Sequence, residues 1–333
     1  MFQRVSISVL FIIVTSSQGA RILGLFPVPA KSHMIVFEPL MKELATRGHQ
    51  VTVVSAFPLD KTKDNYTDIK LDIPDITKIT SDQVVGLEVY PHFHGERQRK
   101  QVGKTTLRTP DRDSRLDLPI ISSLLYCGST ALDYAPTEAG YKSTLVGMNG
   151  FDNIINIMKL GLRVTQLALE SNEVQKLIHD EHQHFDLVFI LSALNEAFYG
   201  FAHKFNASII SICPNVGFPW SLDSVGNKSP SSYVPNWFLS YGYNMTFLQR
   251  FYNTVFNLIM SASREISYLP DQNSLMKKHF HHLKNLPTLP DLERKTSLLF
   301  LNGAPGVTSA RPLLPNVIQL GGIHIKPTKP LPD

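Results

Sequence analysis

Two stretches of the sequence each alternate a short apolar run, an amphipathic segment and a second apolar run. The first stretch begins with RILGLF at Arg21–Phe26 and ends with VTVVSA at Val51–Ala56. Between these runs the apolar residues recur at helical spacing, Ser32 can cap the start of the helix, and Gly48 stands where a left-handed C-terminal cap is needed. This βαβ unit predicts parallel pairing of its two strands.

The second stretch repeats the pattern with FDLVFI at Phe185–Ile190, a helix over residues 197–205, and ASIISI at Ala207–Ile212. Repeated βαβ units predict an α/β fold with a Rossmann-like, doubly wound parallel sheet. Three further elements are predicted: an amphipathic helix over 247–259 and strands at Ser297–Leu301 and Val317–Leu320. The Pro-, Ser- and aromatic-rich region from Pro214 to Tyr243 is predicted to be a long loop.

The composition excludes a disordered or fibrous chain, because 43% of the 333 residues are apolar and can build a sizeable core. The net charge is only +4, and residues 97–115 carry seven Lys or Arg against two Asp. This run lacks the interleaved aromatic residues that stack on bases, so we expect no nucleic-acid partner. The surrounding stretch, about Val84–Lys142, has no periodicity and is interpreted as a doubtful insertion, either a lineage-specific loop or sequence absent from the mature messenger.

Residues 1–19 have the layout of a secretory signal peptide, with Arg4 before an apolar run and small residues at the cleavage point. No later segment is long enough to span a membrane, so the mature chain is expected in the lumen of the secretory pathway. The two cysteines, Cys127 and Cys213, allow one disulfide or two buried free thiols. Four N-x-S/T sequons are candidate glycosylation sites: Asn65, Asn206, Asn227, which is weakened by the nearby Pro230, and Asn244.

His33 is the candidate catalytic residue, because it follows a strand by a short loop at the expected start of a helix. In parallel α/β sheets, ligands bind beyond the carboxyl ends of the strands. The positive end of the helix dipole disfavours imidazolium, so the ring should be neutral near pH 7 and able to act as a general base. The alternative is an ordinary surface histidine beside a helix cap.

Other patterns favour binding rather than catalysis or metal chemistry. Phe218 and Trp220, in the predicted loop, either line an apolar acceptor pocket or fill the core beneath it. The histidines at 179–184 and 279–282 lack the spacing with Glu of a helical zinc site, so no metal is expected. No G-x-G-x-x-G motif follows either strand, and we expect no bound cofactor.

Three separated segments together resemble one known family. They are RILGLFPVPAKSHMIVFEPLMKELATRGHQVTVVS, FDLVFILSALNEAFYGFAHKFNASIIS and ARPLLPNVIQLGGIHIKPTKPLPD. The sequence is similar to the N-terminal half of membrane-bound UDP-glycosyltransferases of the insect type. The resemblance extends over the chain apart from about Val84–Lys142.

The resemblance implies the N-terminal domain of a two-domain GT-B fold, with residues 20–325 binding a small lipophilic or phenolic acceptor. Residues 326–333 would begin the linker to a donor-binding domain that the 333 residues do not contain. The co-substrate would be a UDP-sugar, with UDP-glucose expected, and transfer would invert the anomeric carbon with His33 as base. The endoplasmic reticulum, a role in detoxification, membrane attachment through the C-terminal part, and homo- or hetero-oligomers are also implied.

The sequence departs from the family pattern at the acid that normally orients the catalytic histidine. Its expected position is Leu191, and Asn195 or Glu196 are the possible substitutes. Without a donor domain, the chain is expected not to turn over by itself. The alternative function is a non-catalytic lipophile-binding module or a partner of a full-length glycosyltransferase.

Overall fold

The computed structural model describes residues 19–61, 63–74, 150–236, 238–239, 241–305, 308 and 311–325. Four predicted features lie outside these residues: the signal peptide up to residue 18, the stretch 84–142, Cys127, and the linker 326–333.

The described residues form a seven-stranded sheet in the order β3-β2-β1-β4-β5-β6-β7. Every pair of neighbouring strands is parallel. This is an α/β Rossmann-like architecture, as predicted. The strands are β1 (Arg21–Phe26), β2 (Gln50–Ser55), β3 (Tyr66–Lys70), β4 (Leu187–Leu191), β5 (Ser208–Cys213), β6 (Thr296–Leu301) and β7 (Val317–Gln319).

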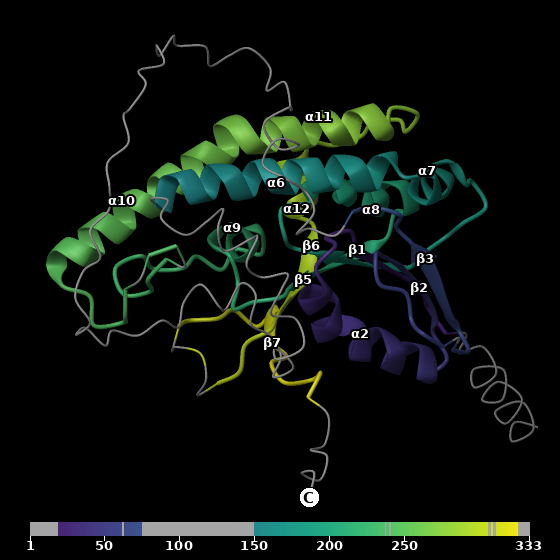
Figure 1. Cartoon of the computed structure of the whole chain (residues 1–333), viewed down its shortest axis with the longest axis horizontal. Helices are drawn as coiled ribbons and strands as arrows, with labels where there is room; N and C mark the ends of the chain where they lie inside the picture. Colours follow the sequence, from purple (N-terminus) through teal and green to yellow (C-terminus); the bar gives the residue numbers. More distant parts are fainter. Residues whose placement is uncertain are drawn as a thin grey trace, which may run out of the picture.

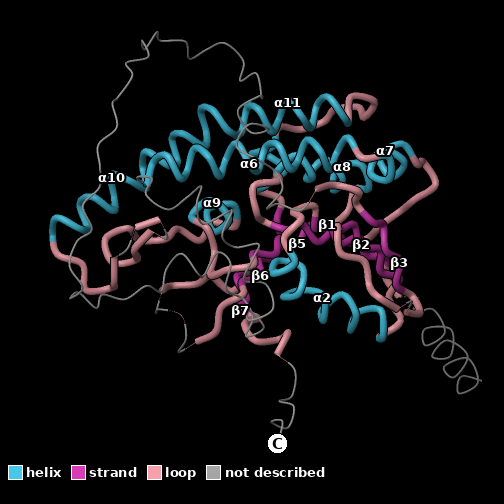
Figure 2. Tube along the Cα trace, in the orientation of Figure 1, coloured by secondary structure: helices cyan, strands magenta, loops and turns pink. Residues whose placement is uncertain are grey.

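Helices cover both faces of the sheet (Figures 1 and 2), with α2 on one face and α6, α7, α8 and α11 on the other. The α-helices are α2 (Lys31–Thr46), α6 (Gly150–Glu170), α7 (Asn172–His179), α8 (Gly200–Phe205), α9 (Pro219–Ser224), α10 (Phe247–Ser263), α11 (Leu269–His279) and α12 (Leu289–Glu293). A 3-10 turn, η3 (Glu196–Tyr199), leads into α8, and a π-helical turn, η4 (Arg264–Tyr268), joins α10 to α11. Among the described residues, no helix is both long enough and apolar enough to cross a bilayer.

The alternation of side chains along β1 divides the core into layers. Leu23 and Leu25 pack with α6, α7, α8 and α11, whereas Ile22 and Phe26 pack with α2. Successive side chains of a strand point to opposite faces, and both faces are covered, so β1 is apolar at nearly every position. A third cluster, which includes Phe256 and Trp220, surrounds the carboxyl ends of β5 and β6.

The predicted strand positions are confirmed to within two residues, and β1 has the predicted bounds. The prediction missed β3, because YTDIK alternates without a fully buried residue at the sheet edge. The predicted long loop was partly wrong, since Pro219 begins the short helix α9 there. Proline suits that position because the first turn of a helix leaves its N–H groups unbonded.

The predicted cap at Ser32 is wrong, whereas Gly48 does adopt a left-handed conformation with φ 89° after α2. The helix begins at Lys31 with Ala30 as its N-cap and no side-chain cap. His33 is therefore the third residue of the helix rather than the first.

The predicted helix over 247–259 is present as α10, but much of its apolar stripe faces solvent. Phe247, Phe251 and Leu258 are 74%, 62% and 66% exposed, whereas Phe256 and Met260 are buried. The hydrophobic period identified the helix correctly but did not identify which side is covered.

Candidate functional site

The site lies where the order of the strands reverses. From β1 the chain continues to β2 on one side, and from β4 it continues to β5 on the other, so β1 and β4 are the central pair. In doubly wound sheets the crevice at this point, beyond the carboxyl ends of the strands, is where ligands bind. His33 follows β1, and the segment 191–196 follows β4.

His33 is a half-buried residue in the first turn of α2. Its Nδ1 lies 3.3 Å from the hydroxyl oxygen of Ser32, and its backbone N–H donates to the carbonyl of Ala30. Burial lowers the pKa of His33 to about 4. The imidazole is therefore neutral at pH 7 and can accept a proton, although burial makes it a weak base.

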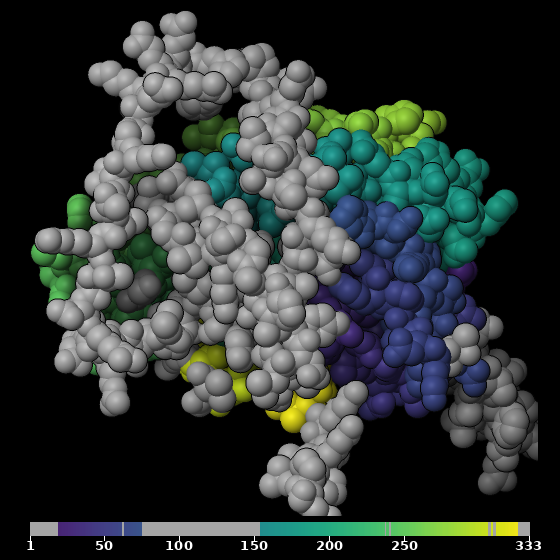
Figure 3. All heavy atoms as spheres, in the orientation of Figure 1, coloured from purple at the N-terminus to yellow at the C-terminus, as the bar shows by residue number. Residues whose placement is uncertain are grey.

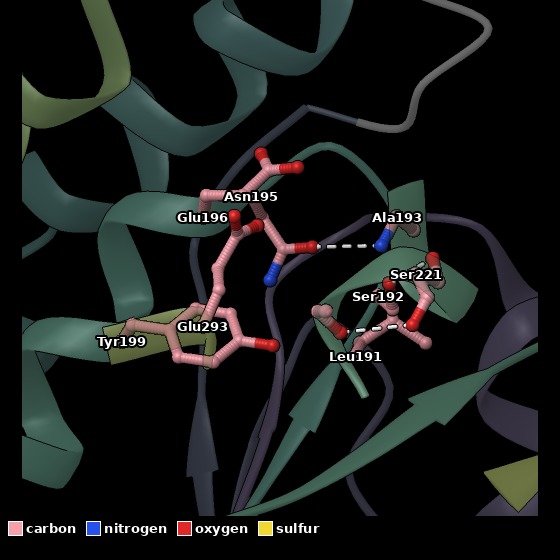
Figure 4. A pocket seen from close by; sticks show the side chains of 9 residues that line it. Leu191, Ser192, Ala193, Asn195, Glu196, Tyr199, Ser221 and Glu293 are labelled. Carbon is pink, nitrogen blue, oxygen red and sulfur yellow. Dashed lines mark hydrogen bonds between the residues drawn. The ribbon is translucent and has the colours of Figure 1, made fainter. Parts of the chain in front are cut away.

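A small cavity lies beyond the carboxyl end of β4 (Figure 4), with room for about one water molecule. Ser192 and Ser221 join across it through a 2.6 Å hydroxyl–hydroxyl hydrogen bond. Asn195 turns back so that its Oδ1 accepts from the backbone N–H of Ala193. Leu191, which lines the cavity, is fully buried and offers no polar atom to an imidazole.

A buried ionic cluster forms the back of this cavity. Glu196 accepts hydrogen bonds from Arg264 at 3.0 Å and from the hydroxyl of Tyr268 at 2.6 Å. The same Nη2 atom of Arg264 contacts Oε1 of Glu293 at 2.5 Å. Gln272 joins the cluster by donating to the Tyr268 hydroxyl. The cluster ties η3, η4, α11 and α12 together behind the site.

Two carboxylates facing one guanidinium leave an excess negative charge in the protein interior. Burial raises the pKa of Glu293 to about 7, and the charge of Glu196 adds to this while Arg264 opposes it. Glu293 is therefore partly protonated near neutral pH, which relieves the excess charge.

The two proposed orienting residues are engaged away from His33. Within the described part of the chain, no hydrogen bond joins His33 to Asn195 or Glu196. Both oxygens of the Glu196 carboxylate already accept hydrogen bonds, and Asn195 binds its own loop. Whether either residue acts on His33 stays a prediction.

Phe218 and Trp220 stack on each other with ring centroids 4.6 Å apart and planes 5° apart. Both are buried in the third core cluster, and Arg264 lies over the Trp220 ring. They follow β5 at the carboxyl edge of the sheet, near the site, but they do not line the cavity beyond β4. Contact with an acceptor therefore stays a prediction for these two side chains.

The four sequons differ in exposure. Asn65, Asn206 and Asn244 are exposed, and the first two adopt left-handed backbone conformations in turns. Asn227 is buried, its Nδ2 donates to the carbonyl of Pro312, and its Oδ1 accepts from the backbone N–H of Leu314. A glycan on Asn227 would have to disrupt both bonds.

The remaining candidates give no reactive centre among the described residues. Cys213 is a buried free thiol whose pKa is raised by burial to about 11, so it is a poor nucleophile. The two histidine clusters meet through His179 and His282, whose rings stack at 5.1 Å. In the described part of the chain, no group of three or more potential ligands is arranged to hold a metal ion.

Sequence reasoning missed four residues of the ionic cluster: Arg264, Tyr268, Gln272 and Glu293. They lie 68, 72, 76 and 97 residues from Glu196 along the chain, and no local motif marks them. The one available signal was Arg264, a charged residue that directly follows the uncharged stretch 251–263.

The parallel sheet, with His33 and a small cavity at its switch point, defines an α/β Rossmann-like domain that is consistent with one domain of a GT-B glycosyltransferase. Comparison with known proteins agrees with this class. The family described as "UDP-glucoronosyl and UDP-glucosyl transferase" matches residues 175–333. This match supports a UDP-glycosyltransferase family assignment for the C-terminal part of the chain.

Curated relatives extend the similarity along the chain. UDP-glycosyltransferase UGT5 of Dactylopius coccus is 28% identical over 94% of this chain and 49% of its own length. Ecdysteroid UDP-glucosyltransferase of Autographa californica nuclear polyhedrosis virus is 29% identical over 96% of this chain and 52% of its own. Human UDP-glucuronosyltransferase 3A1 is 26% identical over 99% of this chain and 53% of its own length. The chain spans about half the length of these relatives.

Proposed function

We propose that this chain is the acceptor-binding half of a UDP-glycosyltransferase that transfers a hexose, with UDP-glucose the expected donor, to a hydroxyl of a small lipophilic acceptor. The position of His33 at the switch point of the sheet is the observation that carries the proposal. The names of the relatives, all UDP-sugar transferases, support the donor class.

In the proposed reaction the acceptor lies between the carboxyl ends of β1 and β4 with its hydroxyl directed at His33. The neutral imidazole accepts the hydroxyl proton while the oxygen attacks the anomeric carbon from the side opposite UDP. The new C–O bond forms as the bond to the UDP oxygen breaks, so the configuration inverts. We propose that the UDP-sugar binds outside the described residues and that maturation takes place in the lumen of the endoplasmic reticulum.

The low pKa of His33 should limit the rate of the proposed transfer. A base works best when its pKa is near the working pH, and an adjacent carboxylate would raise the pKa of His33 by stabilising imidazolium. Leu191, which stands where such a carboxylate is expected, is a buried apolar residue and cannot raise the pKa of His33. We therefore expect slow transfer and an increase in kcat when an acid is introduced at this position.

The test uses the protein expressed from its full-length transcript, with UDP-glucose and 1-naphthol as substrates. His33→Gln should lower kcat by about 10²- to 10⁴-fold with little change in the KM for 1-naphthol. Leu191→Glu should raise kcat. An unchanged kcat in His33→Gln would overturn the assignment of the base. The 333-residue polypeptide alone should bind 1-naphthol without releasing UDP, and turnover by it would contradict the proposed location of donor binding.

A non-catalytic lipophile-binding module is the second candidate, favoured by buried Leu191 and by the engagement of Glu196 with Arg264 and Tyr268. It predicts saturable binding of 1-naphthol that is independent of UDP-glucose and unaffected by His33→Gln. It also predicts no transfer even by the product of the full-length transcript. Transfer that requires His33 would exclude it.

A further inference from the structure

A second concave surface, which His33 does not line, begins beside the first turn of α2 and continues along that helix. It is a groove of about 720 Å³ between α2 and residues 56–61 and 63, which follow β2, and it reaches Lys70 at the end of β3. Small-molecule sites generally have volumes of about 300–1,000 Å³. Neither His33 nor the residues lining the cavity beyond β4 line this groove. The described residues between 19 and 74 are the purple and blue atoms in Figure 3.

The rim of the groove carries an excess of positive charge. Five lysines line it against two carboxylates, Glu38 and Asp60. Glu38 is already paired with Lys42 one helical turn away. Within the described part of the chain the other four lysines form no ion pair: Lys31, Lys61, Lys63 and Lys70.

The rest of the lining is apolar. Met34 is buried, and Ile35, Phe57 and Leu59 are partly buried around it. Isolated exposed lysines are ordinary on a protein surface. Four ammonium groups without an ion-pair partner around a partly apolar concave surface instead complement a ligand with both an anionic group and an apolar body.

We propose that this groove binds a small organic anion with an apolar chain, such as a long-chain carboxylate. The apolar body would lie against Met34 and Phe57, and the anionic group would be held by the lysines at the rim. Lysine ammonium groups act as point charges without the fixed fork of arginine, so the groove should accept carboxylate, sulfate or phosphate monoesters alike. The limited volume of this open groove favours a single small ligand over a polypeptide or an extended bilayer surface.

The experiment measures binding of dodecanoate to the 333-residue chain by isothermal titration calorimetry, without UDP-sugar. Dodecanoate should bind saturably at one site, and acetate and dodecanol should bind at least about tenfold more weakly, because each lacks one of the two recognised features. The triple variant K31Q/K61Q/K70Q should weaken binding of dodecanoate about tenfold. All three lysines are exposed, so the variant should fold normally.

The matched control is K176Q/K277Q/K295Q, which removes the same charge from exposed positions outside the groove. It should change the dissociation constant less than about twofold. Equal weakening in both triple variants, equal affinity for dodecanol, or binding only to vesicles that contain phosphatidylserine would overturn the proposal. Because no step of this assay involves transfer or His33, its failure would be distinguishable from failure of the proposed function.

Discussion

Nη2 of Arg264 lies 2.5 Å from Oε1 of Glu293, and the same atom contacts Glu196, so a single buried guanidinium pairs with two buried carboxylates, while its Nη1 lies 3.5 Å from the exposed Glu265. The three side chains come from η4, α12 and η3, and they fix these elements behind the carboxyl end of β4. A buried ion pair contributes little to net stability when intact, but its remaining charges are costly when one partner is removed.

Arg264→Met should therefore lower the free energy of unfolding by about 3–5 kcal/mol at pH 8, because it leaves two buried carboxylates without a counter-charge. Urea unfolding followed by circular dichroism measures this. The control is Arg294→Met, which breaks an exposed pair with Asp291 and should cost less than about 1 kcal/mol. Similar losses in the two variants would contradict the inferred importance of burial.

Glu293 should make the stability of the folded protein depend on pH. Its pKa is raised from about 4.5 in the unfolded chain to about 7 in the folded protein, chiefly by burial. The folded state then holds the proton more tightly, so this contribution to stability is complete below pH 4.5 and is lost as the pH rises through 7. The stability of wild type relative to Glu293→Gln should therefore fall over this range, as measured by urea unfolding at several pH values. A difference that does not vary with pH would refute the raised pKa.

His33 should make stability change with pH in the direction opposite to that caused by Glu293. Burial lowers its pKa from 6.5 to about 4, so below pH 6.5 the unfolded chain gains a proton that the folded protein does not take up. Stability relative to His33→Asn should therefore rise between pH 4 and 6.5, by at most about 3 kcal/mol. Since the slopes of His33 and Glu293 oppose each other, the wild-type profile should be flatter than that of either variant. A His33→Asn profile parallel to wild type would show that the ring is not shielded from water.

Two phenylalanines five residues apart on α10 should respond differently to truncation. Phe256 is fully buried and Phe251 is 62% exposed. Phe256→Ala should cost about 3–5 kcal/mol, because it leaves a cavity in the third core cluster. Phe251→Ala should change stability by less than about 0.5 kcal/mol. Thermal unfolding of both variants measures the contrast, and a large loss in Phe251→Ala would show that the exposed stripe is covered in solution.

Glycosylation should follow exposure rather than the presence of the sequon alone. In a secretory expression system, Asn65→Gln, Asn206→Gln and Asn244→Gln should each remove one glycan, seen as an increase in electrophoretic mobility. Asn227→Gln should leave the glycan count unchanged. It should instead lower stability by about 1–3 kcal/mol, because two buried hydrogen bonds are disturbed. Loss of a glycan in Asn227→Gln would contradict the buried position.

The limits of sequence reasoning are clear at particular residues. The α10 stripe of Phe247, Phe251 and Leu258 gave the correct helix, but its period says nothing about which side meets the rest of the protein. Ser32 matched a capping pattern, yet the helix begins at Lys31, two residues earlier than this cap predicted, and Ser32 lies inside the first turn. Phe218 and Trp220 were predicted either to line an acceptor pocket or to fill the core beneath a loop, and their mutual stacking was not visible in the sequence.

The sequence by itself determined the parallel α/β class, the nearly complete set of strands, and the position of His33 after the first strand. These follow from local periodicity and from short segments whose meaning is independent of distant residues. Only the tertiary structure decided the strand order, the pairing of Glu196 with Arg264 and Glu293, the burial of Asn227, and the lysine-rimmed groove beside α2. Each of these depends on which distant segments pack together. That packing is determined by the total apolar surface buried across the whole core and not by any local sequence pattern.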